Sequence, residues 1–145
     1  MIHHESTVHV KQPVEQVFTY LAEPQKLALW QSNLVSMEPL TAGPLHAGSR
    51  FREVRVLRGR QSKIDSEVSD FEPYRRLATR TLGQPHVTVS YALRAENGGT
   101  RLTHEFTMET AGMMRLLEPV ISRSIGKESD ADLQRLKQLL ESSRS

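Results

Sequence analysis

The last part of the sequence, residues 118–143, constrains the fold most, because its apolar side chains recur mostly at three- and four-residue steps. This spacing places them along one side of an α-helix, and most of the charged side chains fall on its other sides. About 26 residues at a rise of 1.5 Å give a helix of roughly 39 Å, long enough to cross a small domain. The apolar side chains of this stripe are Ile121, Ile125, Leu133, Leu136 and Leu140. We therefore expect one long amphipathic helix against which the rest of the chain packs.

Upstream of residue 111, most of the chain alternates between apolar and polar residues, which is typical of half-buried strands. The segment Asn97-Gly98-Gly99 is a strong hairpin signal, and short turns of the same kind separate most of the other segments. Consecutive strands joined by short turns form an antiparallel meander with one buried and one hydrated face. The expected strands cover residues 2–10, 35–40, 49–57, 61–71, 75–82, 86–95 and 100–108.

Two short helices are expected between the first and second strands. Pro13 suits the first turn of a helix over residues 13–22, because its missing N–H costs nothing there. Pro24 ends this helix and precedes a second one over residues 25–30, and residues 111–117 form a short helix or a loop. The predicted fold class is therefore α+β: a curved antiparallel sheet, in the order β-α-α-β6-α, wrapped around the long C-terminal helix and enclosing a cavity.

A chain of 145 residues with 37% hydrophobic and 25% charged residues fits one globular domain, residues 1–145. The absence of cysteine excludes disulfides, thiol nucleophiles and thiolate metal sites, and it agrees with a cytoplasmic location. We expect no signal peptide and no integral membrane segment, because no apolar run approaches the roughly 20 residues of a membrane span. Arginines alternate within residues 50–60 and 75–80, which indicates a solvated sheet face rather than a nucleic-acid surface.

The histidines do not predict a metal site. His3 and His4 point to opposite faces of a strand, and His46, His86 and His104 lie on separate elements without ligand spacing. Gly98-Gly99 belongs to a hairpin turn rather than to a loop that cradles phosphate, and no serine lies in an elbow motif. We therefore expect no metal and no cofactor.

Several motifs resemble those of a known superfamily. They are Pro13 after the first strand, the pair Glu23-Pro24 followed by Trp30, and the segments 48–51, 67–77 and 132–141. In these motifs and in its element order, the chain resembles the helix-grip (SRPBCC) superfamily, particularly its polyketide cyclase/dehydrase-like branch. The superfamily also includes START lipid-transfer domains and birch-pollen-type allergens. The resemblance covers nearly the whole chain and implies a helix-grip fold, in which ligands enter between loops and the long helix.

His104 is the most informative single residue, because alternation places it between Leu102 and Phe106 on the inner face of the sheet. A buried histidine there serves either as a hydrogen-bonding or general-base group on a cavity wall, or as a core residue satisfied by a neighbour or water. Tyr91 shares the inner face of the preceding strand and is either a second polar group of the cavity or part of the core.

The strand over residues 49–57 leaves two interpretations open. If Phe51 points inward, Glu53 and Arg55 also point inward and need each other or a ligand as partners. Alternatively, a bulge turns Val54 and Val56 inward and leaves both charges in water. In the first case Glu53 joins His104 as a candidate catalytic residue.

Other features suggest the limits of the pocket. The turn around Gly43-Pro44 is expected to edge the mouth of the pocket. Trp30 either edges the same mouth or serves as a packing anchor. The apolar cluster at residues 113–117 is expected to serve as core or dimer contact. Gly126 in the long helix indicates close packing or a bend that opens the pocket, because a mid-helix glycine costs about 1 kcal/mol relative to alanine. Ser124 or Glu128 would then lie near a ligand. The residues expected to contact a ligand are Trp30, Phe51, Arg55, Tyr91, His104, Phe106, Ile121 and Ile125.

The sequence supports three functional hypotheses. The first is a monomeric or homodimeric binding protein for a hydrophobic small molecule, such as a lipid, polyketide or aromatic metabolite. The second is a metal-independent enzyme of the cyclase/dehydratase kind, in which His104 or Glu53 moves a proton on a carbonyl substrate. The third is a protein-interaction or regulatory module with a closed pocket.

Overall fold

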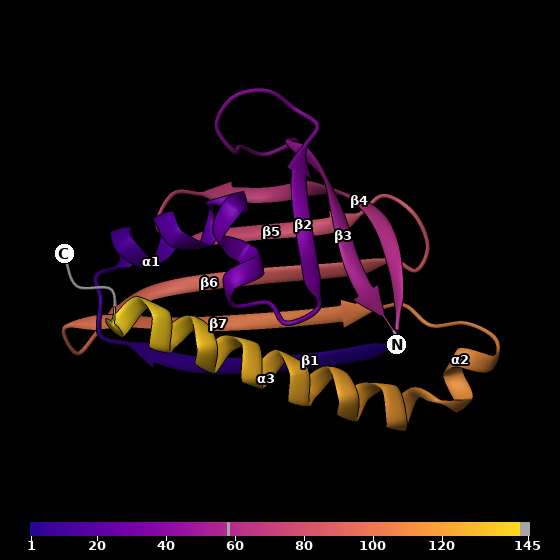
Figure 1. The fold of residues 1–145 in the computed structure, drawn as a ribbon. Coiled ribbons are helices and arrows are strands. Elements are labelled where there is room, and N and C mark those ends of the chain that lie inside the picture. The colour runs from indigo at the N-terminus through magenta and orange to yellow at the C-terminus, as the bar shows by residue number, and fades with distance from the viewer. Residues whose placement is uncertain (58, 143–145) are drawn as a thin grey trace.

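Seven antiparallel strands form one sheet in the computed structural model, which describes residues 1–57 and 59–142 (Figure 1). The strands are β1 (Ile2–Val10), β2 (Leu34–Pro39), β3 (Arg50–Leu57), β4 (Arg60–Glu72), β5 (Arg76–Thr81), β6 (Val87–Glu96) and β7 (Gly99–Met108). Their order is β1-β7-β6-β5-β4-β3-β2, so β2 to β7 form the expected meander and β1 returns to pair with β7. Each expected strand is present, and its ends agree to within one residue.

Four helical segments complete the fold, namely α1 (Val14–Leu21), the 3₁₀ helix η1 (Pro24–Leu29), α2 (Met113–Leu116) and α3 (Glu118–Ser142). Pro13 is the N-cap of α1, which buries Val17, Phe18 and Leu21 as their spacing predicts. The second expected helix is a 3₁₀ helix rather than an α-helix. Arg58, in the expected turn between β3 and β4, and Ser143, the expected last helical residue, lie outside the described residues. Within the described chain, no helix is long and apolar enough to cross a membrane.

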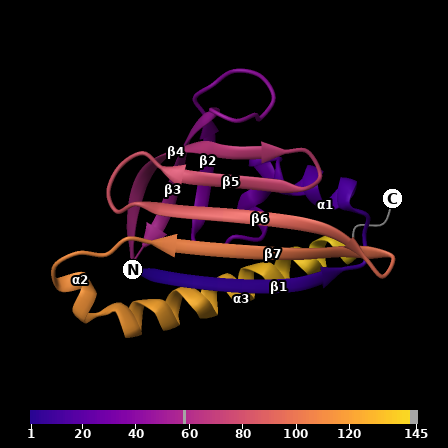
Figure 2. The same ribbon diagram turned by 180° about the vertical axis from the view of Figure 1, so that it is seen from behind.

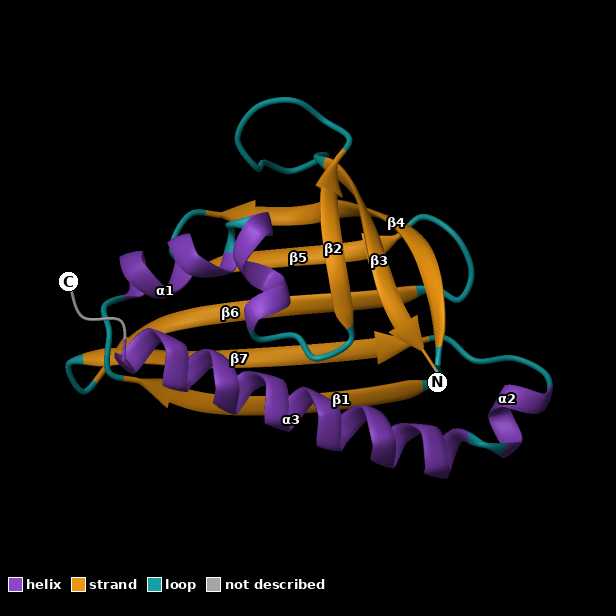
Figure 3. Cartoon of the chain, in the orientation of Figure 1, coloured by secondary structure: helices purple, strands orange, loops and turns teal. Residues whose placement is uncertain are grey.

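The sheet curves around α3, which lies diagonally across its concave side and packs beside β1 (Figures 1 and 3). The two halves of α3 have different environments. Leu133, Leu136 and Leu140 in its C-terminal half are buried in the core, together with residues of α1, β1 and β7. Ile121 and Ile125 in its N-terminal half are only partly buried. The predicted helix-grip fold class is confirmed, and the space beneath the N-terminal half of α3 remains open.

The convex face of the sheet, whose strands Figure 2 shows from behind, carries four of the alternating arginines, whereas Arg55 points to the concave side. Acidic side chains of β4 pair with arginines of its two neighbouring strands, β3 and β5. These pairs are Arg50 and Arg80 with Glu67, Arg52 with Asp65, and Arg76 with Asp70. Opposite charges on neighbouring strands stabilise such a face modestly and keep it hydrated.

Candidate functional site

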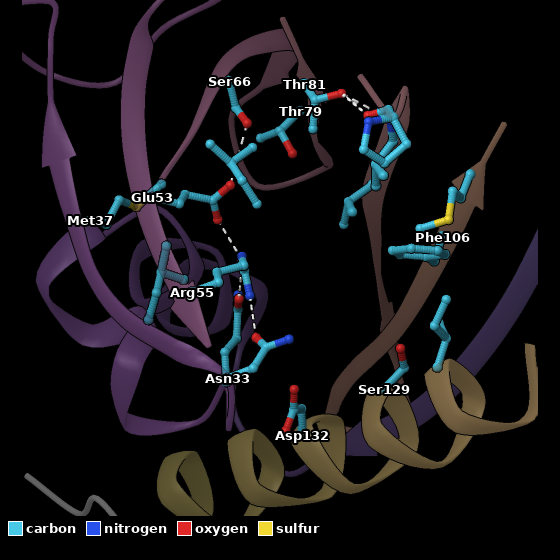
Figure 4. Close-up of a pocket in the computed structure, with 18 of the residues that line it drawn as sticks. Asn33, Met37, Glu53, Arg55, Ser66, Thr79, Thr81, Phe106, Ser129 and Asp132 are labelled. Atoms are coloured by element: carbon cyan, nitrogen blue, oxygen red, sulfur yellow. Dashed lines mark hydrogen bonds and ion pairs between the residues drawn. The ribbon is translucent and has the colours of Figure 1, made fainter. Parts of the chain in front are cut away.

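A cavity of about 1310 Å³ lies between the concave face of the sheet and the N-terminal half of α3. Pockets for drug-sized ligands have volumes of about 300–1,000 Å³, so this space is large enough for an extended or polycyclic molecule. Its walls come from α1, η1, strands β2 to β7, α2 and α3, and Figure 4 shows part of them. Most of the lining residues are apolar, and a group of polar ones that includes Asn33, Glu53, Arg55 and Asp132 gathers where β2, β3 and α3 approach one another.

The structure brings together all the residues that the sequence analysis selected. Trp30, Phe51, Arg55, Tyr91, His104, Phe106, Ile121 and Ile125 all line this cavity, and so does Glu53. Their alternation along strands and their helical spacing placed them correctly on inward faces. Whether these residues contact a ligand stays a prediction.

Glu53 and Arg55 both point into the cavity (Figure 4). The pairing of β3 with β4 runs without a register shift, so Phe51, Glu53 and Arg55 share one face. The irregularity lies instead in the pairing of β2 with β3, between Leu34 and Ser36. The alternative in which a bulge turns Val54 and Val56 inward is therefore wrong. The side chains of Glu53 and Arg55 are only 12% and 20% exposed.

A chain of hydrogen bonds satisfies this partly buried ion pair (Figure 4). The guanidinium of Arg55 donates to Glu53, to Oδ1 of Asn33 and, at 2.7 Å, to Oε1 of Gln31. The Ser66 hydroxyl donates to the second oxygen of Glu53 at 3.3 Å. Burying two charges is tolerable because each has several partners. Gln31 and Asn33 were not foreseen, because nothing in their local sequence shows that they fold back onto β3.

Helix α3 contributes a second polar group to the same end of the cavity. Ser129 and Asp132 point from α3 toward the ion pair in Figure 4, and Glu128 also lines the space. Burial raises the pKa of Glu128 above its ordinary value. Asp132 is held in place by the backbone N–H of Ser32 at 3.1 Å and by Arg135 at 3.0 Å. The sequence analysis named Glu128 but missed Asp132, although its spacing of seven residues from Ile125 places it on the same helical face.

Three aromatic rings form a continuous series along another wall of the cavity. The ring of Trp30 meets that of Tyr91 edge-on at 6.1 Å, and the Tyr91 ring lies 5.1 Å from the imidazole of His104. Trp30 is only 2% exposed and belongs to the core, so the expectation that it edges the mouth is wrong and that of a packing anchor is right. In the turn near Gly43-Pro44, Leu45 is the residue that reaches the cavity.

His104 is neutral at physiological pH. Burial, and to a smaller extent the neighbouring His4, lower its pKa from the ordinary 6.5 to about 4. Burial likewise raises the pKa of the Tyr91 hydroxyl above its ordinary value. Among the side chains of the described residues, two buried nitrogen atoms have no hydrogen-bond partner, namely Nδ1 of His104 and Nε1 of Trp30. Because buried polar atoms are normally paired, these two atoms mark the wall where a bound polar group or water would gain most.

The arrangement defines what the site can do chemically. An apolar cavity favours a hydrophobic body, and its polar groups can orient a molecule by hydrogen bonds. A neutral imidazole in a desolvated wall can accept a proton at pH 7. Three carboxylates, Glu53, Glu128 and Asp132, face the polar end together with the single guanidinium of Arg55.

Comparison with known proteins extends these observations. No curated protein matches the sequence. The fold is similar to the crystal structure of TTHA0849 from Thermus thermophilus, with a TM-score of 0.83, 17% identity and 99% of each chain covered. It is also similar to the Zhui aromatase/cyclase from Streptomyces sp. R1128, with a TM-score of 0.76, 22% identity, and 96% of this chain and 93% of that chain covered. For DR_A0006 from Deinococcus radiodurans the TM-score is 0.74, the identity 20%, and the coverage 97% and 98%.

These similarities show the fold alone. The family of the chain is shown by a match of its sequence to a protein-family model. The model described as "Polyketide cyclase / dehydrase and lipid transport" matches residues 1–141. This match agrees with the resemblance carried by the sequence motifs and with the helix-grip topology of the sheet and α3. The chain therefore belongs to the polyketide cyclase/dehydrase and lipid transport family of helix-grip proteins.

Proposed function

We propose that this protein binds a hydrophobic small molecule, such as a lipid, polyketide or aromatic metabolite, in the cavity beneath α3. The observation that carries the proposal is the cavity of about 1310 Å³ with its mostly apolar walls and its polar groups at one end. Family membership supports the same class of ligand. Apolar burial supplies most of the affinity, and the hydroxyl of Tyr91, His104 and the groups around Arg55 orient the ligand.

The single tryptophan of the chain gives a direct test, because Trp30 lines the cavity. A neutral naphthalene derivative that enters the cavity should change Trp30 fluorescence, and native mass spectrometry of the freshly purified protein should show any co-purified ligand. Thr79→Phe projects a ring into the cavity from β5 and should weaken binding about tenfold or more by excluding the ligand.

Thr88→Phe is the matched control, because Thr88 is exposed on β6 and lies beside Arg80 on the convex face. It should leave the fluorescence titration unchanged. Equal binding by the Thr79→Phe and wild-type proteins would contradict the proposal, provided that both are folded by circular dichroism.

A second candidate function is favoured by one specific observation, the neutral and unpartnered His104 on the cavity wall. In this hypothesis the protein is a cyclase/dehydratase-like enzyme acting on a carbonyl substrate. His104 accepts a proton from the carbon next to the carbonyl and returns it to the β-hydroxyl, which leaves as water while the Cα–Cβ double bond forms. Glu53 is the less suitable base, because its carboxylate is engaged by Arg55 and Ser66.

Dehydration of a β-hydroxy ketone to the conjugated enone, followed by ultraviolet absorbance, tests this alternative. His104→Ala should abolish turnover, whereas His3→Ala should not, because His3 is exposed on β1 and points away from the cavity. Turnover that survives in His104→Ala would remove His104 from any catalytic role. A protein-interaction module with a closed pocket is less well supported, because the cavity holds many water volumes.

A further inference from the structure

Four large apolar side chains are unusually exposed at one end of the molecule. Met113 and Leu116 are each 80% exposed, Val120 is 71% exposed and Leu117 is 47% exposed. They lie on α2 and the first turn of α3, and we refer to these four residues as the mouth patch. Single exposed apolar residues need no explanation, but a contiguous group of large ones indicates an interaction surface.

The mouth patch lies at an edge of the cavity. Met113, Leu117 and Val120 line the cavity while remaining exposed, whereas Leu116 does not line it. Across the same opening, Leu82 in the turn between β5 and β6 is also exposed and lines the cavity. In Figures 1 and 2, α2 projects beyond the end of the sheet, so a flat surface can reach it without contacting the strands.

Three basic side chains lie on the same helices as the mouth patch. Arg115, Arg123 and Lys127 are exposed, and within the described chain none of them is in an ion pair. Lys127 follows Val120 by seven residues and therefore shares its side of α3. The nearest acidic group on these helices, Glu118, is already paired with the N-terminal amine at 2.8 Å and with Thr110.

The size and charge of this surface decide between possible occupants. A standard protein–protein interface uses about 20–30 residues on each side, far more than the mouth patch offers. Docking against a second copy of this chain would also bring the same unpaired cations of the two copies face to face, and these would repel each other. A lipid surface has no such requirement, since apolar side chains enter its interface and basic side chains gain from anionic headgroups.

We propose that the mouth patch docks onto an anionic membrane surface, with its apolar side chains at the level of the upper acyl chains. Arg115, Arg123 and Lys127 then lie near the lipid phosphates. In this orientation the cavity opens toward the lipid, which gives a hydrophobic ligand a path that avoids water. Leu116 and the three basic residues do not line the cavity, so docking can be tested apart from ligand binding.

Flotation of the full chain with vesicles tests the docking. Wild-type protein should float with vesicles of phosphatidylcholine and phosphatidylglycerol, less with pure phosphatidylcholine, and less again in 0.5 M salt because the salt screens the charges. Leu116→Asp should reduce binding to the anionic vesicles about tenfold or more, because it replaces an inserted apolar side chain with an anion. Arg123→Glu should reduce it about fivefold or more.

Leu29→Asp is the matched control, since Leu29 is an exposed leucine on η1, an element separate from α2 and α3, and it does not line the cavity. It should float like the wild type. Both leucine variants should keep their circular dichroism spectra and the Trp30 response to a naphthalene probe, which separates loss of docking from loss of ligand binding.

Three results would overturn the proposal. The first is wild-type protein that does not float with the anionic vesicles. The second is an equal loss of flotation in Leu29→Asp and Leu116→Asp. The third is a dimer, detected by sedimentation velocity, that the Leu116→Asp substitution dissociates, together with wild-type protein that does not bind vesicles. This result would assign the mouth patch to contact with a second copy of the chain.

Discussion

Gly126 of α3 lies directly against the imidazole of His4 on β1. A Cβ atom built at Gly126 would lie 3.0 Å from Cε1 of His4 and 3.1 Å from its Nδ1. The imidazole cannot move away easily, because Nε2 of His4 is within 3.0 Å of both the Ser6 hydroxyl and Oδ1 of Asp130. Close packing between α3 and β1 therefore explains this mid-helix glycine.

We expect Gly126→Ala to destabilise the protein, although alanine is the better helix former. The introduced Cβ requires the His4 ring to shift against its hydrogen bonds, and this opposes the helix-propensity gain of about 1 kcal/mol. In a His4→Ala background the ring is absent, so Gly126→Ala should recover that gain. Urea unfolding of the four proteins in this double-mutant cycle measures the coupling. Additive effects would show that the contact between Gly126 and His4 has no energetic importance.

The lowered pKa of His104 predicts a pH dependence of stability. The unfolded chain binds a proton at His104 below its ordinary pKa of 6.5, whereas the folded protein resists protonation until about pH 4. His104 therefore makes its full contribution to the free energy of unfolding above pH 6.5, and this contribution is lost as the pH falls toward 4. The difference between the two pKa values corresponds to about 3 kcal/mol.

Urea unfolding between pH 4 and 7 should show this slope in the wild type, and it should be flatter in His104→Asn. A proton NMR titration should place the pKa of His104 near 4. A midpoint near 6.5 would mean that water or a ligand solvates the imidazole.

The ion pair between Glu53 and Arg55 should contribute to stability because it faces the cavity. Arg55→Met leaves the Glu53 carboxylate partly buried without its cation and should lower the free energy of unfolding by about 2–4 kcal/mol. Arg76→Met provides the control, because Arg76 and Asp70 pair with side chains 43% and 40% exposed and neither residue lines the cavity. It should have little effect on the urea midpoint. Equal midpoints for the two variants would show that the ion pair in the cavity is solvated like the surface pair.

The Tyr91 hydroxyl should matter for ligand orientation more than for folding. Only burial and distant charges affect its pKa, and no hydrogen bond to a described residue contributes. Tyr91→Phe should therefore change the free energy of unfolding by less than about 1 kcal/mol. Trp30 fluorescence titrations with 1-naphthol and 1-methylnaphthalene would report its role in binding. We expect the variant to lose about fivefold in affinity for 1-naphthol only, because a lost hydrogen bond costs about 1 kcal/mol. Equal losses for both probes would indicate a change of cavity shape instead.

The local sequence determined the elements and most of the inward-facing residues. Strict alternation along β6 and β7 predicted that Tyr91, His104 and Phe106 share the buried face, and the structure confirms it. The apolar stripe of α3 predicted one helix lying across the sheet. These features depend on periodicity, which is a local property of the chain, and the family resemblance rested on the same elements.

Only the tertiary structure decided how polar residues from distant segments combine. Alternation could not exclude a bulge in β3, because the position of a bulge depends on how neighbouring strands pair, and the irregularity lies between β2 and β3. Gln31 and Asn33 accept hydrogen bonds from Arg55. Both come from a loop whose path is set by the packing of η1. The apolar cluster at residues 113–117 was likewise expected to serve as core or dimer contact, because its exposure depends on where α2 lies relative to the end of the sheet. Periodicity specifies which way a side chain points within its own element, and the folded chain decides what it meets there.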